Sequence, residues 1–207
     1  MKRLLFIAVI AAAIAWFFLG KRDSGGYVNL PPTATGEWVA FGDSLTSGYG
    51  ASKGHDYPTL LAKRLDVKIQ NHGAPGRTTA GGLEKLDGVV ALKPRVVLLC
   101  LGGNDGLNQL PREAMFKNLE TMIDRFHRAG SFVVLIGVRS STLRDKNADG
   151  FEDLADKKRV LLVPNILDGV LANPALMSDQ IHPNDAGYEK IAGRIEDELL
   201  PVLSKLR

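Results

Sequence analysis

Three residues in this sequence are of types and at spacings that could carry out acyl transfer. Ser44 follows a short apolar run, and Asp179 and His182 lie three residues apart near the end of the chain. A serine hydroxyl is a weak nucleophile until a base removes its proton, and histidine is the common base near neutral pH. A carboxylate three residues before a histidine can reach the imidazole within one tight turn and fix its tautomer. We therefore predict that Ser44 is a nucleophile, His182 its base and Asp179 the group that orients this base.

Each of these residues also has an ordinary structural explanation. Ser44 could cap a helix, because serine is favoured at that position. Asp179 could begin a helix, His182 could lie on the surface, and Asn104 could belong to a glycine-rich turn. All of these explanations would have to hold together, whereas a single site accounts for the whole set.

The elements that must position these residues follow an alternating pattern. Strands are expected at 38–41, 67–70, 96–101, 132–138 and 160–163, and helices at 57–65, 82–92, 112–128 and 185–203. Strands with unbroken apolar sequences suit a parallel sheet that is covered on both faces. The pattern predicts an α/β fold: a three-layer α/β/α, flavodoxin-like, doubly wound parallel sheet of about five strands. In such folds ligands bind beyond the carboxyl ends of the strands, where Ser44, Gly73 and Asn104 are expected.

Four segments, taken together and in order, resemble the sequence blocks of the GDSL or SGNH hydrolase family. They are residues 41–46 (FGDSLT), 71–79 (NHGAPGRTT), 101–106 (LGGNDG) and 179–184 (DQIHPN). The most similar subgroup is the lysophospholipase, thioesterase and arylesterase type. The resemblance implies an ester hydrolase with Ser44, Asp179 and His182 as its triad. It also implies an oxyanion hole formed by the backbone N–H groups of Ser44 and Gly73 and by the side chain of Asn104, and no cofactor.

The segment before Asp179 contains apolar residues that could line an acyl pocket or pack in the core: Ile166, Leu167, Val170, Leu171, Leu176 and Met177. Of these we expect Leu176 and Met177, together with Asp43 and Leu107, to contact the substrate. The expected substrate is a small-molecule ester or lipid with a short to medium acyl chain. Aryl esters, lysophospholipids and acyl thioesters are all compatible with the resemblance. Two alternatives stay open: a carbohydrate deacetylase of the same superfamily, and a non-catalytic, membrane-tethered binding module.

The second block departs from the family pattern at two positions. Pro75 and Arg77 stand where serine and aspartate are common in relatives. Arg77 is therefore expected to place a positive charge near the mouth of the pocket, which leaves a preference for anionic head groups open.

One further string resembles a calcium-binding loop. Oxygen-bearing side chains recur at loop positions 1, 3, 5, 9 and 12, with glycine at position 6. The five candidate ligands are Asp145, Asn147, Asp149, Asp153 and Asp156. The family chemistry needs no metal, and a polar surface loop would explain the same string, so no metal is the primary expectation.

The basic isoelectric point, near 9.0, comes from the N-terminal region. Lys2, Arg3, Lys21, Arg22 and Asp23 account for four of the 26 basic and one of the 23 acidic residues, so the remaining chain carries 22 of each. A formally neutral body argues against a nucleic-acid partner.

Residues 4–19 form an uncharged apolar segment flanked by basic pairs. It is at the lower edge of the roughly 17–25 residues that span a bilayer, and tryptophan and phenylalanine near its end suit a membrane interface. We expect residues 1–20 to be a membrane anchor or a signal segment, 21–36 a linker and 37–207 the hydrolase domain. The domain is then expected outside the cytoplasm, on the periplasmic side. It would be tethered to the inner membrane, or secreted if the segment is cleaved; the oligomeric state stays open.

Overall fold

A single sheet of five parallel strands forms the centre of the computed structural model, which describes residues 26–138 and 147–207. The strand order is β2-β1-β3-β4-β5, so β1 lies between β2 and β3. The strands are β1 (Trp38–Gly42), β2 (Ile69–Gly73), β3 (Val96–Cys100), β4 (Phe132–Ile136) and β5 (Leu161–Val163). The expected doubly wound α/β architecture is confirmed. Its topological switch point, where the strand order reverses, lies between β1 and β3.

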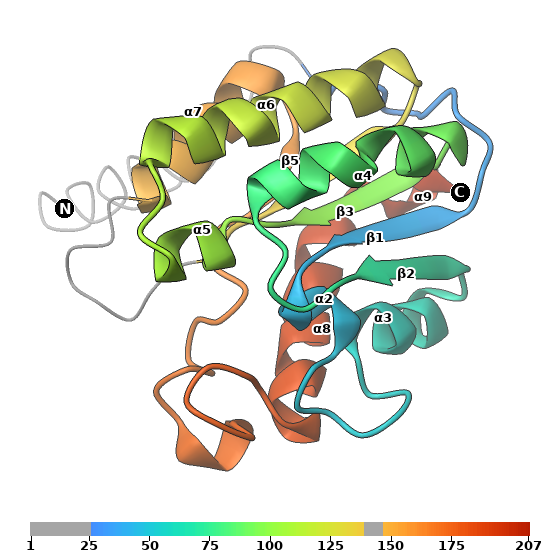
Figure 1. Cartoon of the computed structure of the whole chain (residues 1–207). Coiled ribbons are helices and arrows are strands. Elements are labelled where there is room, and N and C mark those ends of the chain that lie inside the picture. The colour runs from blue at the N-terminus through green and yellow to red at the C-terminus, as the bar shows by residue number, and fades with distance from the viewer. Residues whose placement is uncertain (1–25, 139–146) are drawn as a thin grey trace, which may run out of the picture.

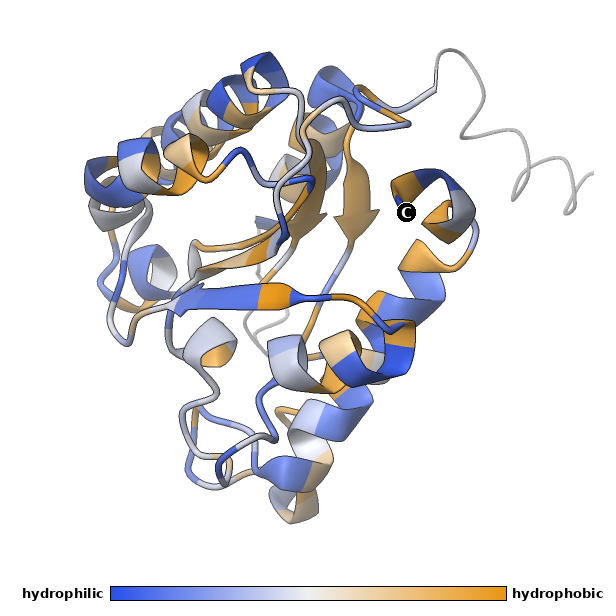
Figure 2. Ribbon diagram, turned by 90° about the vertical axis from the view of Figure 1, so that its right-hand side faces the viewer, coloured by the Kyte–Doolittle hydropathy of each residue, from blue (hydrophilic) through white to orange (hydrophobic). Residues whose placement is uncertain are grey.

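Helices cover both faces of the sheet (Figure 1). One face carries α3 (Tyr57–Leu65), α8 (Asp185–Leu199) and the short α9 (Leu203–Leu206), and the other carries α4 (Thr79–Ala91), α6 (Arg112–Arg128) and α7 (Asn147–Lys158). Successive strand residues point to opposite faces, so β3 sends Leu98 into one core cluster and Leu99 into the other. Figure 2 shows the result as apolar central strands inside helices whose outer surfaces are hydrophilic.

Strand β2 differs from the sequence-based expectation of 67–70. It begins two residues later and ends at Gly73, because it pairs in register with β1 from Trp38 opposite Ile69 to Gly42 opposite Gly73. Asn71 is exposed and the other four residues are only partly buried, which is why this edge strand can contain glutamine, asparagine and histidine. Pairing with a neighbour, rather than apolar content, makes this segment a strand.

Helix ends follow local chemistry. Helix α4 begins three residues earlier than expected, because the Thr78 side chain accepts a hydrogen bond from Gly81 N–H and caps it. Helix α8 ends at Leu199 rather than at 203, shortly before Pro201, which has no N–H for a continuing helix. Helices α3 and α6 have the expected bounds.

The described part of the expected linker is packed against the body. Val28 N–H donates to Arg159 O, and the Asn29 side chain donates to the carbonyls of His127 and Ser131. The Tyr27 ring meets Phe132 edge-on at 5.8 Å. Residues 26–36 therefore run along the end of the sheet where β4 and β5 begin.

The expected membrane segment, residues 1–20, lies outside the described residues, as do linker residues 21–25. Among the helices of the described ranges, none combines the length and the apolar character that a bilayer crossing requires.

Candidate active site

The carboxyl ends of β1, β2 and β3 bring the site residues together. Helix α2 (Ser44–Ser47) begins directly after β1, and α5 (Gly103–Leu107) begins just after β3. Gly42 ends β1 between Gly73 and Cys100, and a Cβ at Gly42 would lie 2.5 Å from Cys100 O. This close approach of neighbouring backbones places Ser44 and Asn104 on one edge, as the strand order predicts.

Ser44, His182 and Asp179 form one hydrogen-bonded series. His182 Nε2 lies 3.2 Å from Ser44 Oγ, and His182 Nδ1 lies 2.8 Å from Asp179 Oδ2. An ionised carboxylate only accepts, so the imidazole must carry its proton on Nδ1. In the neutral ring Nε2 is then the acceptor that faces the serine hydroxyl. This arrangement can deprotonate Ser44 as its oxygen attacks an acyl carbon.

Asp179 is held as an anion by its own loop. Its Oδ1 accepts from the N–H groups of Ile181 and His182, each at 2.7 Å. The bond from the His182 ring, followed by these two backbone bonds, lowers the pKa of Asp179 to about 2. The loop is closed by Ser178 N–H, which donates to His182 O at 2.8 Å. The carboxylate therefore remains charged at neutral and mildly acidic pH.

Asp43 is buried beneath the site rather than open to a substrate. It is 2% exposed, and its Oδ1 caps α2 by accepting from Leu45 N–H at 3.0 Å. Its Oδ2 lies 3.3 Å from Asn104 Nδ2. Burial raises the pKa of Asp43 to about 6, against the opposing effect of the Leu45 bond. The expected substrate contact is therefore replaced by a link between the helix of Ser44 and the side chain of Asn104.

Asn104 also contacts the turn between β2 and α4. Its Nδ2 donates to Arg77 O at 3.1 Å, which joins α5 to this turn. Asp105, its neighbour, is 3% exposed and accepts from Thr79 N–H at 2.8 Å and from Thr79 Oγ at 2.6 Å. Asn118 on α6 donates to the same hydroxyl. These bonds fix the loop of Asn104 against the start of α4.

The structure does not support the assignment of Gly73 as an oxyanion donor. Gly73 N–H donates to Asn71 Oδ1 at 2.9 Å, and its Cα packs so closely on α2 that a Cβ would lie 2.1 Å from Ser47 N. Gly76, three residues later, has φ +76° and stands immediately before the residue whose carbonyl contacts Asn104. Within the described part of the chain, neither Gly76 N–H nor Ser44 N–H has a hydrogen-bond partner. Gly76 therefore replaces Gly73 as the candidate donor.

A signal for Gly76 was present in the sequence. Pro75-Gly76 is a typical central pair of a turn whose third residue needs positive φ. The structure has this turn, closed by Arg77 N–H donating to Ala74 O at 3.2 Å.

The residues expected to contact substrate differ in exposure. Leu107, at the end of α5, is 60% exposed. Leu176 and Met177 are half-buried and pack on the core beside α8, with Leu176 ending the 3₁₀ turn η1 (Pro174–Leu176). Upstream, Ile166, Leu167 and Val170 are buried core residues, which agrees with core packing rather than an acyl pocket.

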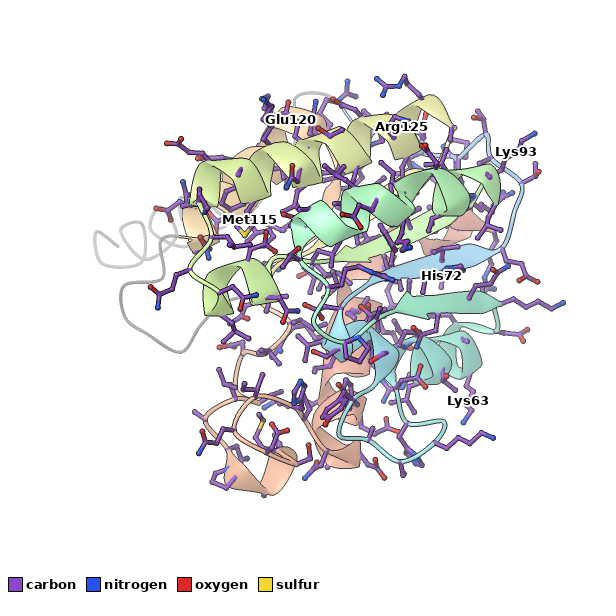
Figure 3. All side chains as sticks on the ribbon, viewed as in Figure 1. Lys63, His72, Lys93, Met115, Glu120 and Arg125 are labelled. Atoms are coloured by element: carbon purple, nitrogen blue, oxygen red, sulfur yellow. The ribbon has the colours of Figure 1, made fainter. Side chains whose placement is uncertain are left out.

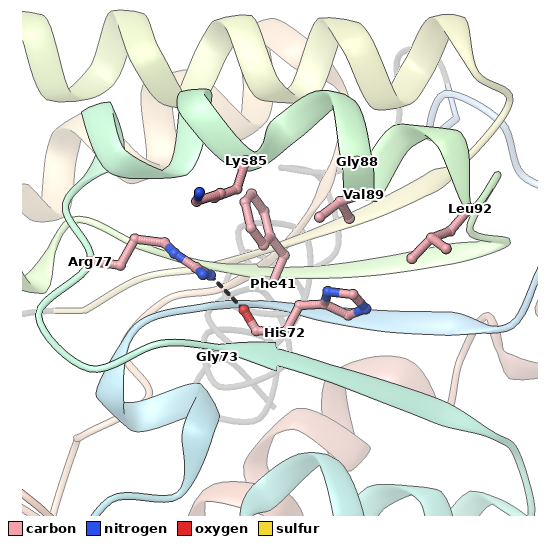
Figure 4. A pocket seen from close by; sticks show the side chains of 8 residues that line it. All are labelled: Phe41, His72, Gly73, Arg77, Lys85, Gly88, Val89 and Leu92. Carbon is pink, nitrogen blue, oxygen red and sulfur yellow. Dashed lines mark hydrogen bonds between the residues drawn. The ribbon is translucent and has the colours of Figure 1, made fainter.

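Arg77 lines a separate groove between α4 and β2. This groove, of about 450 Å³, has Phe41 and Val89 at its base and Lys85 and His72 beside Arg77 (Figure 4). The guanidinium donates to Gly42 O at 2.9 Å and to His72 O at 2.5 Å, so it braces the ends of β1 and β2. Figure 3 shows His72 on β2 below α4. The guanidinium of Arg77, which we expected at the mouth of the substrate pocket, therefore binds backbone carbonyls instead.

The calcium-loop interpretation is wrong for the part of this string that the structure describes. Asp149, Asp153 and Asp156 share the exposed face of helix α7, and Asn147 begins the same helix. These residues therefore form regular helix rather than a loop that wraps around an ion. Asp145 lies outside the described residues. In the described ranges, no three histidine, cysteine or carboxylate side chains gather as a metal site would require.

Comparisons with known proteins agree with this geometry. Residues 40–190 match the GDSL-like Lipase/Acylhydrolase family. The chain is 31% identical over 179 residues to the protein named "Arylesterase" from Vibrio mimicus, covering 81% of this chain and 90% of that protein. It is 28% identical over 175 residues to "Thioesterase 1/protease 1/lysophospholipase L1" of Escherichia coli (strain K12), covering 80% and 84%. The crystal structure of TesA matches with a TM-score of 0.75 at 28% identity, over 80% of this chain and 98% of that one.

Proposed function

Because this chain belongs to the GDSL-like lipase/acylhydrolase family and is a carboxylic ester hydrolase, we propose that Ser44, His182 and Asp179 carry out its reaction through an acyl-enzyme intermediate. The observation that carries this proposal is the continuous series from Asp179 Oδ2 through the imidazole to Ser44 Oγ, with separations of 2.8 and 3.2 Å. Ser52 also lies beside a histidine, at 3.0 Å from His55 Nδ1, but Asp185 is near that same nitrogen and accepts directly from Ser52, so no carboxylate orients His55 from behind.

In the first half of the reaction Ser44 Oγ attacks the ester carbonyl carbon while its proton passes to His182 Nε2. The tetrahedral intermediate collapses when the imidazolium returns that proton to the leaving-group oxygen. In the second half a water molecule attacks the acyl carbon while its proton passes to His182 Nε2. The Ser44 Oγ–acyl bond then breaks, the imidazolium returns the proton to Ser44 Oγ, and the acid leaves. Asp179 remains ionised throughout and stabilises the imidazolium.

The negative charge of the intermediate requires donors directed at the carbonyl oxygen. We assign this role to the N–H groups of Ser44 and Gly76 and to Asn104 Nδ2. The two backbone donors need no reorganisation, because they have no partner among the described residues. Asn104 is held in position by Arg77 O and Asp43, so the oxyanion would share one of its two N–H groups or displace a bond from it.

The substrates we propose are esters with short to medium acyl chains. Support comes from the relative named as an arylesterase and from exposed Leu107 beside Asn104, which offers apolar surface at the site. Lysophospholipids and acyl thioesters are the further substrate class, supported by the name of the Escherichia coli relative.

The proposal is tested with p-nitrophenyl esters of graded acyl length and the full chain. We expect turnover that declines for long chains and falls by at least ~10⁴-fold in Ser44→Ala. Ser47→Ala is the matched control, because Ser47 lies on the same helix and its hydroxyl donates to the carbonyl of Ser44 rather than to the reacting groups. Turnover that survives Ser44→Ala would rule out the assigned nucleophile. Activity on acetylated sugars without activity on longer acyl esters would instead favour the deacetylase alternative.

We also propose that residues 4–19 tether the enzyme to the inner membrane, with residues 37–207 on the periplasmic side. The uncharged apolar segment between two basic pairs supports this. In fractionated cells the full chain should remain with the membrane after an alkaline wash, whereas a chain without residues 1–20 should not. A soluble mature protein that lacks the segment would show cleavage and secretion instead.

A further inference from the structure

Tyr49 places an exposed aromatic ring against the imidazole of His182. The two ring centroids are 4.5 Å apart and the planes are inclined by 51°. Tyr49 is 53% exposed, so much of its surface faces solvent rather than the core. No hydrogen bond involves its hydroxyl in the part of the chain that the structure describes.

The backbone of Tyr49 is fixed to the segment that carries the nucleophile and to the helix that follows the base. Its N–H donates to Ser44 O at 3.0 Å. Its carbonyl accepts from the hydroxyl of Tyr188, a fully buried residue on α8, at 2.9 Å. The ring therefore has a defined position relative to both Ser44 and His182.

The next residues attach this loop to the segment that carries the base. Gly50 has φ +91°, and a Cβ there would lie 2.2 Å from Ser178 Oγ and 2.7 Å from Pro183 O. Ser52 donates twice to Asp185, from its N–H at 2.7 Å and from its hydroxyl at 2.5 Å. Figure 1 shows the loop after α2 beside the first turn of α8. A ring held this firmly, yet largely outside the core, contributes little to stability through burial.

The proton transfers of the reaction suggest a role for the ring of Tyr49 beside His182. His182 Nε2 must first accept the proton of Ser44 and then donate it to the leaving-group oxygen. The leaving group must therefore lie within hydrogen-bond reach of the imidazole, and the tilted ring of Tyr49 lies beside that imidazole. An aromatic leaving group can pack edge-on or offset against Tyr49, whereas a saturated one gains only general apolar contact.

We propose that Tyr49 contacts the leaving group and gives this enzyme a preference for esters of aromatic alcohols. This inference rests on the proposed function, because it needs His182 to be the proton donor. Tyr49 is thus a specificity-determining residue on the alcohol side of the site, separate from the residues expected to contact the acyl chain.

Benzyl acetate and cyclohexylmethyl acetate test the inference. The two substrates share the acyl group, and their alcohols have similar acidity and nearly the same size. The ratio of their kcat/KM values is measured for the wild-type chain, Tyr49→Phe and Tyr49→Leu. We expect Tyr49→Leu to lower the benzyl-to-cyclohexylmethyl ratio by roughly 2- to 10-fold, the range of one aromatic pair contact. Tyr49→Phe keeps the ring and should keep the ratio.

Equal losses on both esters in Tyr49→Leu would mean that the ring only orients His182, and an unchanged ratio without any loss would mean that it does neither. Either result overturns the inference. Failure of the proposed function is distinguishable, because the wild-type chain would then hydrolyse neither ester or would do so independently of Ser44. A second measurement needs no variant: benzyl alcohol should inhibit the wild-type enzyme more strongly than cyclohexylmethanol, and equal inhibition would also overturn the inference.

Discussion

Single side chains at this site have two roles each, and Asp43 is the clearest case. It caps the helix that begins with Ser44 and also accepts from Asn104. Desolvation of its carboxylate is unfavourable, and this is why its pKa is raised to about 6. The buried carboxylate of Asp43 therefore positions α2 and Asn104, while its desolvation lowers the free energy of unfolding.

The pH dependence of unfolding should reveal this residue. The pKa of Asp43 is about 6 in the folded chain and 3.8 in the reference state, so the folded protein binds the proton more tightly. The stability linked to that proton is complete below pH ~3.8 and is lost as pH rises through ~6. We expect the unfolding free energy of the wild type, relative to Asp43→Asn, to fall by on the order of 2–3 kcal/mol between pH 4 and pH 7. Urea unfolding of both proteins at both pH values measures this, and a constant difference would contradict it.

Gly76 provides a second test at the residue scale. Gly76→Ala keeps the N–H but strains the turn, because alanine at positive φ costs about 1 kcal/mol. If the strained turn moves the Gly76 N–H away from the oxyanion, kcat/KM on p-nitrophenyl acetate should fall by roughly 10-fold or more. This is less than the ~10²–10³-fold loss typical when an oxyanion donor is removed completely.

Gly54→Ala is the matched control for that variant. Gly54 also has positive φ, at +86°, and both positions have open space for a Cβ. The two variants should lose similar stability, but Gly54→Ala should keep its activity. Equal losses of kcat/KM in both would remove Gly76 from the oxyanion hole.

At the scale of elements, two of the three glycines in helix α4 have opposite surroundings. A Cβ at Gly88 would meet nothing within 4 Å, whereas one at Gly82 would lie 2.7 Å from Leu101 Cδ1 and 2.9 Å from Met122 Cε. Both alanine substitutions gain the same helix propensity. Gly88→Ala should therefore raise the unfolding free energy by about 0.5–1 kcal/mol. Gly82→Ala should be about 1–3 kcal/mol less stable than Gly88→Ala, because it overpacks the core. Thermal unfolding of the two variants compares them directly, and equal stability would show that the core yields at Gly82.

The elements also show what a sequence can predict. Strands β1, β3 and β4 and helix α6 were predictable because burial on both faces of a strand, or on one stripe of a helix, leaves a direct apolar pattern. The observed bounds of β2 differ from the predicted ones, because they depend on hydrogen-bonded pairing with β1. Local composition carries no information about that pairing. The calcium string was misleading because the same polar residues also suit the exposed side of an amphipathic helix.

In the candidate site, too, some features could be predicted from the sequence and others depend on three-dimensional contacts. Ser44 and Asn104 come to one edge as the sequence predicts, because the topology brings the ends of β1 and β3 together. Asp179 and His182 reach the same edge from the loop before α8, where His182 Nε2 lies 3.2 Å from Ser44 Oγ.

The Pro75-Gly76 turn is readable from the sequence, but the sequence cannot show that Gly73 N–H already has an acceptor. This acceptor is the Asn71 side chain, and which N–H it accepts from follows from the three-dimensional position of the β2 end.

At the scale of the whole molecule, the two ends of the sheet have different tasks. The carboxyl ends of the strands carry the candidate chemistry, and the opposite end is closed by residues 26–36. Asn29 donates to two carbonyls there, each at 2.9 Å, and adopts φ +55°, which asparagine tolerates better than most residues. Stability and activity should therefore be separable by changes at this end.

Two truncations and one substitution test that separation. A chain that starts at residue 37 should unfold more readily than one that starts at residue 26, by roughly 1–3 kcal/mol, because the contacts of Tyr27, Asn29 and Ala34 are lost. Asn29→Asp keeps the shape of the side chain but removes its donors, so it should reproduce about 1–2 kcal/mol of this loss. Where each protein is still folded, kcat/KM on p-nitrophenyl acetate should stay within about twofold of the wild type, since no contact of this segment reaches Ser44 or His182. Equal stability of the two truncated chains would instead place the start of the folded domain at residue 37, and a selective loss of kcat/KM would show that the two ends of the sheet are coupled.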